Sequence, residues 1–333
     1  MYTHHYGLTD RPFQLTPDAR FWFNSRTHKK AMAYLGYGIA QGEGFITVTG
    51  EIGAGKSTLA AHLLATIDRE RLNAVSLVST QVEGDDMLRL AAQGFGLATE
   101  GLAKAQILDR MEQILADQAA QGKRSLLIVD EAQSLATSAL EELRMLSNFT
   151  RQGRALLQIF LLGQPEFRDR LASDEGLEQL RQRVIATHHL DAMEPNEVEP
   201  YLVHRLAVAG WQGRPGFDAG AFAAIHRHTG GIPRRVNQLA NRILLYGAVE
   251  NLDRITAAEV EAVASDMASD RPPLRAAASQ GTSEPVADLA LERRIAQLEG
   301  RLEEQEVVLR RVLTLLVDWV ENTSAPGYRS NAA

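Results

Sequence analysis

The chain has 333 residues, of which 45% are hydrophobic, so it can bury a sizeable core and is expected to hold two or three structural units. It contains no cysteine, which excludes disulfides and thiolate metal sites. The formal net charge of −7 argues against a protein that coats DNA, although a local basic patch is compatible with it.

Neither a signal peptide nor a membrane span is expected. The first residues contain no basic stretch followed by an apolar one. No apolar run approaches the roughly 20 residues that a helix needs to cross a bilayer.

Residues 1–44 form an N-terminal segment. Loops with aromatic anchors are expected around Tyr6 and Phe13, followed by a helix that runs to about Gln41 and is capped by Ser25 or Asn24. Two interpretations of this segment remain open. It could help to cover an adenine base, because it lies just before the first core strand, or it could simply pack on the core.

A glycine-rich stretch stands between an apolar run and a helical pattern. Residues 45–49 predict a buried strand and residues 59–65 predict a helix. The glycine loop between them matches G-x-x-x-x-G-K-[ST] and consists of Gly50, Glu51, Ile52, Gly53, Ala54, Gly55, Lys56, Ser57 and Thr58. Strand, loop and helix in this order predict a phosphate-binding loop for ATP, whose backbone N–H groups point at phosphate oxygens. Within it, Lys56 is expected to reach the β- and γ-phosphates and Ser57 to bind Mg²⁺.

From residue 45 onward, strand and helix patterns alternate. Further strands are predicted over residues 74–78, 125–129, 156–162 and 187–190, and helices over 86–94, 102–120 and 138–149. Such alternation predicts a parallel sheet with helices on both faces. Residues 45–192 are therefore expected to form an α/β nucleotide-binding domain of the P-loop type.

Two acidic residues close the predicted third strand. After a glycine-loop lysine, an apolar strand that ends in Asp130 and Glu131 has the Walker B pattern. Asp130 is then expected to hold Mg²⁺, and Glu131 to orient the attacking water as a general base. The alternative is that both acids only cap the helix that follows.

Polar residues follow the next strands. Gln164 comes directly after the fourth strand and could hydrogen-bond the attacking water or the γ-phosphate; the alternative is a loop residue that faces solvent. Arg181 and Arg183 precede the fifth strand. Either could act as an arginine finger on a neighbouring subunit's nucleotide, with Arg183 favoured, or both could remain solvated surface charges.

Only helices are predicted from residue 193 to 268, which suggests a helical lid. They span residues 197–209 with Asn196 as cap, 218–229 with Asp218 as cap, 233–249, and 256–267 with a capping box of Thr256 and Glu259. Arg234 and Arg235 begin the third of these helices. They could reach back to the phosphates or remain solvated.

The C-terminal part has a different composition. Residues 269–288 are rich in Ser, Pro, Ala and Gly and are predicted to form a linker. Residues 289–321 carry an apolar stripe with alternating spacings of four and three, which predicts a coiled coil of about four heptads. A lone amphipathic helix that folds back on the lid is the alternative. Residues 322–333 are expected to be a disordered tail.

Taken together, these features resemble the AAA+ ATPases, and more narrowly the general secretion pathway protein A type. Within that group the chain is most similar to the ATPase encoded beside exosortase/PEP-CTERM exopolysaccharide loci. The motifs that carry the resemblance are Tyr6-Gly7-Leu8, Pro12-Phe13, Pro17-Asp18, His28 with Ala31, Gly44-Phe45 leading into the glycine loop, Asp130-Glu131-Ala132-Gln133, Gly163-Gln164-Pro165-Glu166, Gln182-Arg183, His204-Arg205-Leu206 and Gly231-Ile232-Pro233-Arg234-Arg235-Val236-Asn237.

The resemblance implies roles for three residues: Gln164 as sensor 1, Arg183 as the finger and Arg234 as sensor 2. It also implies a homo-oligomer in the form of a ring or partial ring. Secretion-type members work with an inner-membrane partner, and some continue into a transmembrane helix and a peptidoglycan-binding domain. This chain instead continues into the predicted linker and coiled coil, which fits the exopolysaccharide-locus type better.

These observations predict an oligomeric, Mg²⁺-dependent AAA+ ATPase that powers or regulates an envelope export or assembly system for exopolysaccharide or protein. It is expected in the cytoplasm or peripherally at the inner membrane, with an envelope protein and not a nucleic acid as partner. The alternative is a DNA-binding AAA+ ATPase of the transposition-regulator type. A nucleotide-binding scaffold that hydrolyses little is disfavoured by Glu131, the candidate base.

Overall fold

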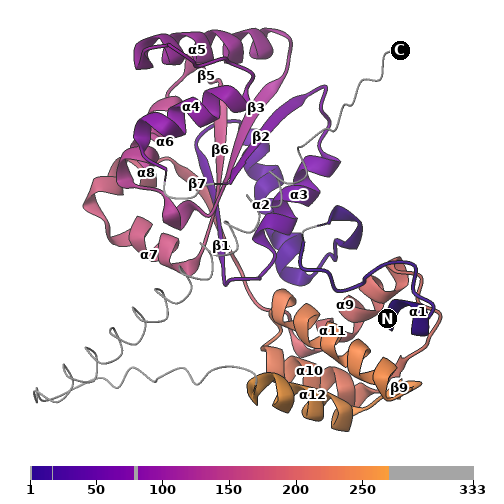
Figure 1. The fold of residues 1–333 in the computed structure, drawn as a ribbon. Coiled ribbons are helices and arrows are strands. Elements are labelled where there is room, and N and C mark those ends of the chain that lie inside the picture. Colours follow the sequence, from indigo (N-terminus) through magenta and orange to yellow (C-terminus); the bar gives the residue numbers. More distant parts are fainter. Residues whose placement is uncertain (1, 17, 79–81, 270–333) are drawn as a thin grey trace, which may run out of the picture. The chain divides into compact units, whose positions relative to one another are not determined.

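The computed structural model describes residues 2–16, 18–78 and 82–269 (Figure 1). The predicted coiled coil and tail, and the linker beyond residue 269, lie outside these ranges. None of the helices within the described ranges is both long and apolar enough to cross a membrane.

The predicted parallel sheet is confirmed. Its strands stand in the order β2-β3-β6-β1-β7, and each pairs in parallel with its neighbours. The strands are β1 (Phe45–Gly50), β2 (Leu72–Val78), β3 (Arg124–Asp130), β6 (Leu157–Gly163) and β7 (Val184–Leu190). Because all five run in one direction, the segments that follow β1, β3 and β6 meet at the same edge of the sheet.

Helices cover both faces of this sheet, as predicted (Figure 1). Side chains alternate across the strands, so that Leu127 and Val129 of β3 face one hydrophobic cluster while Leu126 and Ile128 face the other. The first cluster is closed by α4 (Gly84–Gly94), α5 (Lys104–Ala120), α6 (Thr137–Leu146), α7 (Pro165–Ser173) and α8 (Glu178–Arg181). The second is closed by α2 (Arg26–Gln41) and α3 (Lys56–Thr66).

A helical region follows the sheet. It has its own hydrophobic cluster and consists of α9 (Pro195–Val208), α10 (Ala219–Thr229), α11 (Pro233–Val249) and α12 (Ala257–Ser269), with the short strands β8 (Gly216–Phe217) and β9 (Arg254–Ile255). Asp218 caps α10 and Pro233 occupies the first turn of α11, as the sequence predicts. The Glu259 carboxylate accepts a hydrogen bond from the Thr256 backbone N–H, as expected for a capping box.

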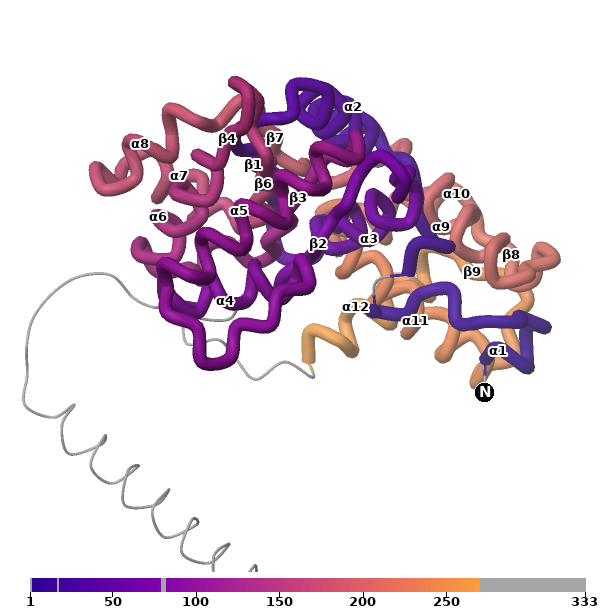
Figure 2. The backbone as a smooth tube through the Cα atoms, turned by 90° about the horizontal axis from the view of Figure 1, so that it is seen from above, coloured from indigo at the N-terminus to yellow at the C-terminus, as the bar shows by residue number. Residues whose placement is uncertain are grey.

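The N-terminal segment packs on this helical region. The short helix α1 (Tyr2–His5) lies against α11 (Figure 2), and Tyr2, Tyr6 and Phe13 belong to the same hydrophobic cluster as the lid helices. Hydrogen bonds reinforce the contact: Tyr6 Oη donates to Leu252 O at 3.1 Å. Residues 2–13 are therefore a structural part of the helical region, although they precede the sheet in sequence, whereas α2 of the same segment packs on the sheet.

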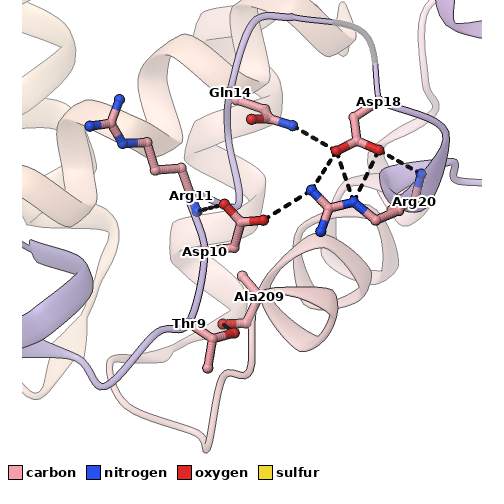
Figure 3. Close-up of polar contacts among 7 residues, drawn as sticks. All are labelled: Thr9, Asp10, Arg11, Gln14, Asp18, Arg20 and Ala209. Carbon is pink, nitrogen blue, oxygen red and sulfur yellow. Dashed lines mark hydrogen bonds and ion pairs between the residues drawn. The ribbon is translucent and has the colours of Figure 1, made fainter.

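A network of hydrogen bonds and ion pairs holds residues 9–20 of this segment (Figure 3). Thr9 donates to the Ala209 carbonyl through both its backbone N–H and its hydroxyl, at 2.9 and 3.1 Å. The Arg20 guanidinium bridges Asp10 and Asp18 at 3.1 and 2.7 Å, and Gln14 donates to Asp18. Asp18 also caps the 3₁₀ turn η1 (Ala19–Phe21). Because Arg20 is exposed, this ion-pair network fixes geometry more than it adds stability.

Several boundaries differ from the sequence-based expectations. Helix α9 begins at Pro195 with Glu194 as its cap, and not at Glu197 with Asn196 as its cap. Pro195 fits the first helical position, and the Glu197 carboxylate accepts from the Glu194 N–H at 3.0 Å. Helix α6 ends at Leu146, before Phe149. The chain turns there into a hairpin of β4 (Thr150–Arg151) and β5 (Arg154–Ala155) that the periodicity does not reveal.

Other differences are smaller. Helix α5 begins at Lys104 and not at Leu102, and β7 begins at Val184, three residues before the predicted start. The sequence analysis does not predict helix α7, because its apolar pattern is short and directly follows Gly163 and Pro165, which are typical of a loop. The remaining 3₁₀ turns are η2 (Ala132–Ser134) and η3 (Glu175–Leu177).

A buried glutamine ties α2 to the sheet. Gln158 of β6 is 4% exposed, and its Nε2 donates to the carbonyl oxygens of Gly38 and Glu43 at 2.7 and 3.1 Å. We expect Gln158→Leu to lower the free energy of unfolding by about 1–3 kcal/mol, because the Glu43 carbonyl loses this donor and the Gly38 carbonyl keeps only the Gly42 N–H. Urea denaturation measures this change. Gln113→Leu on the exposed side of α5 is the control, and equal midpoints for the two variants would contradict the expectation.

Candidate functional site

The glycine loop (residues 50–58) joins β1 to α3. Gly53 and Gly55 have φ values of +87° and +104°, in the left-handed region that glycine alone adopts without strain. Helix α3 begins at Lys56, and Gly55 at its cap provides no side-chain hydrogen bond. The first N–H groups of α3 are therefore available to an anion.

The two glycines are also required for space. A Cβ atom on Gly53 would lie 2.3 Å from Cβ of Arg234, and one on Gly55 would lie 2.6 Å from Nε2 of His28. Both distances are far below van der Waals contact. The loop is thus packed between the first turn of α11 and the first turn of α2.

Lys56 is 6% exposed and lies back along the loop. Its Nζ donates to the carbonyl oxygens of Gly50 and Glu51 at 2.7 and 3.1 Å. Burial lowers the pKa of the Lys56 ammonium, while the nearby carboxylates of Glu131 and Asp130 act in the opposite direction. A buried cation that can exchange carbonyl partners for phosphate oxygens is suited to a triphosphate.

Ser57 and Asp130 come together at the end of the sheet. The Ser57 hydroxyl donates to Oδ2 of Asp130 at 2.5 Å, and Oδ1 of Asp130 accepts from the Glu131 N–H at 2.9 Å. A hydroxyl and a carboxylate are hard oxygen ligands, which suit Mg²⁺ when phosphate oxygens and water complete its coordination. The sequence-predicted metal pair is therefore adjacent in space, and its donor set fits magnesium.

Glu131 has a strained backbone and an ordered side chain. Its φ of 58° lies in the left-handed region, which is uncommon for a residue other than glycine and is often associated with functional sites. Its carboxylate Oε2 accepts from Nε2 of Gln164 at 3.2 Å and from Nε2 of Gln133. Gln133 Oε1 in turn accepts from the Gln164 N–H at 3.0 Å. Two amides thus hold the candidate base beside the glycine loop.

Gln133 is a site residue that the motif analysis does not single out. Its only sequence signal is its place two residues after Glu131, within the stretch that carries the family resemblance. Gln164, by contrast, lies where the sequence predicts it, at the end of β6 between the two strands that carry the glycine loop and the acidic pair.

The two arginines before β7 differ in their surroundings. The Arg181 guanidinium donates to the carbonyls of Leu171 and Ala172 and pairs with Glu178. The Arg183 guanidinium instead donates to the carbonyl and the hydroxyl of Ser147, at 3.4 and 3.2 Å. Because β7 pairs with β1 in register, Arg183 lies near the start of β1, about 17 Å along the strand from the glycine loop.

The lid arginines also separate. The Arg234 backbone N–H donates to Gly53 O at 3.1 Å, and its side chain lines the same pocket as the glycine loop. Arg235 instead lines a separate groove with His228 and Gln238. The structure therefore brings Arg234 to the predicted site and not Arg235.

The pocket above the glycine loop combines distant parts of the chain. Besides the loop, Glu131 and Gln164, it is lined by residues of the N-terminal segment and of the lid helices. These are Leu15, Phe21, Trp22, Phe23, Ser25 and His28 from the former, and Met193, Tyr201, Arg205, Pro233, Arg234 and Asn237 from or beside the latter. The N-terminal segment thus packs on the core and also lines the pocket, and its covering of an adenine base stays a prediction.

The imidazole ring of His28 packs against the glycine loop beside Gly55. Its Nδ1 lies 2.7 Å from the Ser25 hydroxyl, which is also the N-cap of α2. Trp22 packs edge-on against the His28 ring and stacks on His62 of α3. Burial lowers the pKa of His28 to about 4.

This shift predicts a pH dependence of stability. Since the unfolded chain binds a proton near pH 6.5 and the folded chain does so only near pH 4, falling pH favours unfolding within that window. Between pH 7 and 4.5, the free energy of unfolding should fall by about 2–3 kcal/mol more in the wild type than in His28→Asn. Urea denaturation at both pH values measures the free energy of unfolding. If it falls equally in the two proteins, the lowered pKa of His28 is wrong.

Comparisons with known proteins identify the kind of domain that contains the glycine loop. Residues 39–171 match the family model described as an AAA domain. The general secretion pathway protein A of Aeromonas hydrophila is 35% identical over 272 residues, which cover 81% of this chain and 49% of that protein. The chain therefore spans about half the length of this relative.

Solved structures share the fold. The ORC2 protein of Aeropyrum pernix in its ADP form has a TM-score of 0.59 at 17% identity, covering 78% of this chain and 73% of that chain. CDC6P of Pyrobaculum aerophilum has a TM-score of 0.59 at 14% identity, covering 78% and 71%. At these identities the similarity concerns the fold alone.

Proposed function

We propose that this AAA domain protein, which is related to general secretion pathway protein A, is a Mg²⁺-dependent ATPase that powers or regulates an envelope export or assembly system. One observation carries the ATPase part of the proposal. Two charged or polar residues of the glycine loop, Lys56 and Ser57, lie at a single edge of the sheet. At the same edge stand Asp130, which accepts from Ser57, and Glu131 with its two amide donors.

Each residue has a chemical role in the proposal. Lys56 and the loop N–H groups bind the β- and γ-phosphates, and Ser57 and Asp130 hold Mg²⁺, which neutralises phosphate charge when bound. Glu131 orients the attacking water and accepts its proton, while Gln164 positions the Glu131 carboxylate from 3.2 Å. Arg234, whose backbone already contacts Gly53, serves as sensor 2 of the lid.

The export part of the proposal is supported by the relative's name and by the sequence resemblance to exopolysaccharide-locus ATPases. The partner is then an envelope protein, and the place of action is the cytoplasmic side of the inner membrane. Because only about half of the relative is matched, its remaining half provides no guide to the partner of this chain.

A DNA-binding ATPase is the second candidate, and one feature favours it. The β4–β5 hairpin presents Arg151 and Arg154, both exposed, and neither forms an ion pair with a described residue. An exposed basic hairpin is suited to phosphate backbones.

ATP hydrolysis at low salt, measured with and without duplex DNA, tests the proposal. We expect Mg²⁺-dependent turnover that DNA does not change. Lys56→Ala should lose both ATP binding and turnover, whereas Glu131→Gln should still bind ATP and lose turnover by about 10²-fold or more. No turnover in the wild type at any Mg²⁺ concentration would refute the ATPase, and strong, salt-sensitive stimulation by DNA would favour the second candidate.

We further propose that Arg183 acts on the nucleotide of a neighbouring subunit. Its place near the start of β7, at the opposite end of the sheet from its own glycine loop, excludes a role at its own phosphates. The neighbour's site is then incomplete without it, which requires a ring or partial ring.

Mixing two inactive variants tests this arrangement. Glu131→Gln subunits keep Arg183, and Arg183→Ala subunits keep Glu131, so random mixing in a ring should restore about a quarter of the wild-type sites. Arg181→Ala is the control, and it should be active without being mixed with a second variant. If the mixture stays as inactive as its components, the proposed role of Arg183 is wrong.

A further inference from the structure

We propose that Asn237 is a nucleoside-binding residue, whose side-chain amide donates a hydrogen bond to the nucleoside of the bound nucleotide. The inference rests on the proposed ATPase function, because it takes the phosphates to lie at the glycine loop. Asn237 stands on α11, three residues after Arg234, and both line the pocket that contains Gly53 and Lys56.

A chain of hydrogen bonds fixes the orientation of this amide. Arg205 Nη1 lies 3.4 Å from the Tyr201 hydroxyl, and that hydroxyl lies 2.8 Å from the Asn237 side chain. An arginine can only donate, so the Tyr201 oxygen accepts and its single proton is free to donate onward. Among the described residues, the Asn237 side chain is the acceptor that this proton meets, so the atom in contact is Oδ1 and the NH₂ group is directed elsewhere.

Arg205 is itself fixed by the N-terminal segment. Its Nε donates to the Pro12 carbonyl at 2.6 Å, and its guanidinium lies over the Phe21 ring at 4.8 Å from the centroid. Arg205, Tyr201 and Asn237 are each 7% exposed or less. The relay is therefore buried, and the same segment that lines the pocket also holds its first member.

The Asn237 NH₂ group has no hydrogen-bond partner among the described residues. In that part of the chain, the fully enclosed side-chain atoms that lack a partner are Nε2 of His5 and Nε2 of His204. The Asn237 nitrogen is thus not among the fully enclosed atoms, although the residue is only 7% exposed. We take the pocket, which Asn237 lines, as the space that this nitrogen faces. This donor can therefore bond to an acceptor on a ligand in the pocket without giving up a bond to the protein.

The surroundings favour a nucleoside over a phosphate. The side chains that the N-terminal segment and the start of the lid contribute to the pocket are mostly apolar or aromatic, among them Leu15, Phe21, Phe23 and Met193. Flat apolar walls suit a purine ring, and a neutral amide reads ring nitrogens or ribose oxygens without adding charge. The phosphates have their own donors in the glycine loop.

Binding of ATP and of inorganic tripolyphosphate, compared by titration calorimetry, tests the inference. Asn237→Asp keeps the acceptor for Tyr201 and removes the donor. We expect its Kd for ATP to rise about tenfold while its Kd for tripolyphosphate stays unchanged. Tyr201→Phe, which frees the amide to rotate, should weaken ATP binding by a smaller factor and also spare tripolyphosphate.

The controls separate this inference from the proposed function. Lys56→Ala should weaken both ligands, and if it weakens neither, the glycine loop is not the phosphate site and the proposed function fails. If both Asn237→Asp and Tyr201→Phe bind ATP like the wild type, or lose both ligands equally, the nucleoside role of Asn237 is wrong while the ATPase proposal stands. Should Asn237→Asp fail to fold, Tyr201→Phe alone decides the question by the same comparison.

Discussion

The close contact of the glycine loop with two other elements is the constraint on which the site depends. Gly53 and Gly55 have left-handed backbones that disfavour other residues, and the places where their side chains would stand are filled by Arg234 and His28. Conformation and packing therefore require the same residue type. Because Arg234 and His28 fill the space beside these two glycines, a change in the loop's conformation there must be accommodated by the first turn of α11 or of α2.

The first turn of α2 also reaches the connection between the sheet and the lid. Thr27 Oγ1 donates to the His189 carbonyl at 3.4 Å and accepts from the Asp191 N–H at 3.1 Å. Arg26 pairs with Glu194, the cap of α9, at 2.7 Å. Three successive residues, 26–28, thus contact the start of the lid, the chain leading to it, and the glycine loop. A rigid helical turn that touches all three is a physical basis for linking phosphate contact to lid position.

Much of this could be predicted from the sequence, and the physical reasons are specific. The strands β1, β3 and β6 are short apolar runs that end at Gly50, Asp130 and Gly163. The helix caps Ser25 and Asp218 have side chains that satisfy free N–H groups. Motif spacing places Lys56, Ser57 and Asp130 together because parallel strands end at one edge. Where competing signals exist, as at Glu194 and Asn196 before α9, proline geometry prevails over cap preference.

The missed features are those in which residues distant in sequence meet. Asn237 and Tyr201 both stand in helices that read as ordinary amphipathic segments, and only their 2.8 Å contact gives them a polar purpose. Gln133 has the same character in one respect, since its side-chain oxygen accepts from the N–H of Gln164, 31 residues further along the chain. The β4–β5 hairpin is too short to produce a period. A pattern within one segment can reveal which face is buried, but it carries no information about the partner on the other side.

The polar groups of the site share one energetic property. Lys56 donates to loop carbonyls, Ser57 donates to Asp130, and Glu131 accepts from two amides, so each has a partner within the protein. Contact with a nucleotide must exchange these bonds for others, and the net gain from each exchange is small compared with the gross strength of a hydrogen bond. Asn237 differs, because its donor has no protein partner to give up. Its bond to a ligand replaces only a bond to water, which is why the nucleoside end of the pocket, and not only the glycine loop, is expected to contribute to how tightly the nucleotide is held.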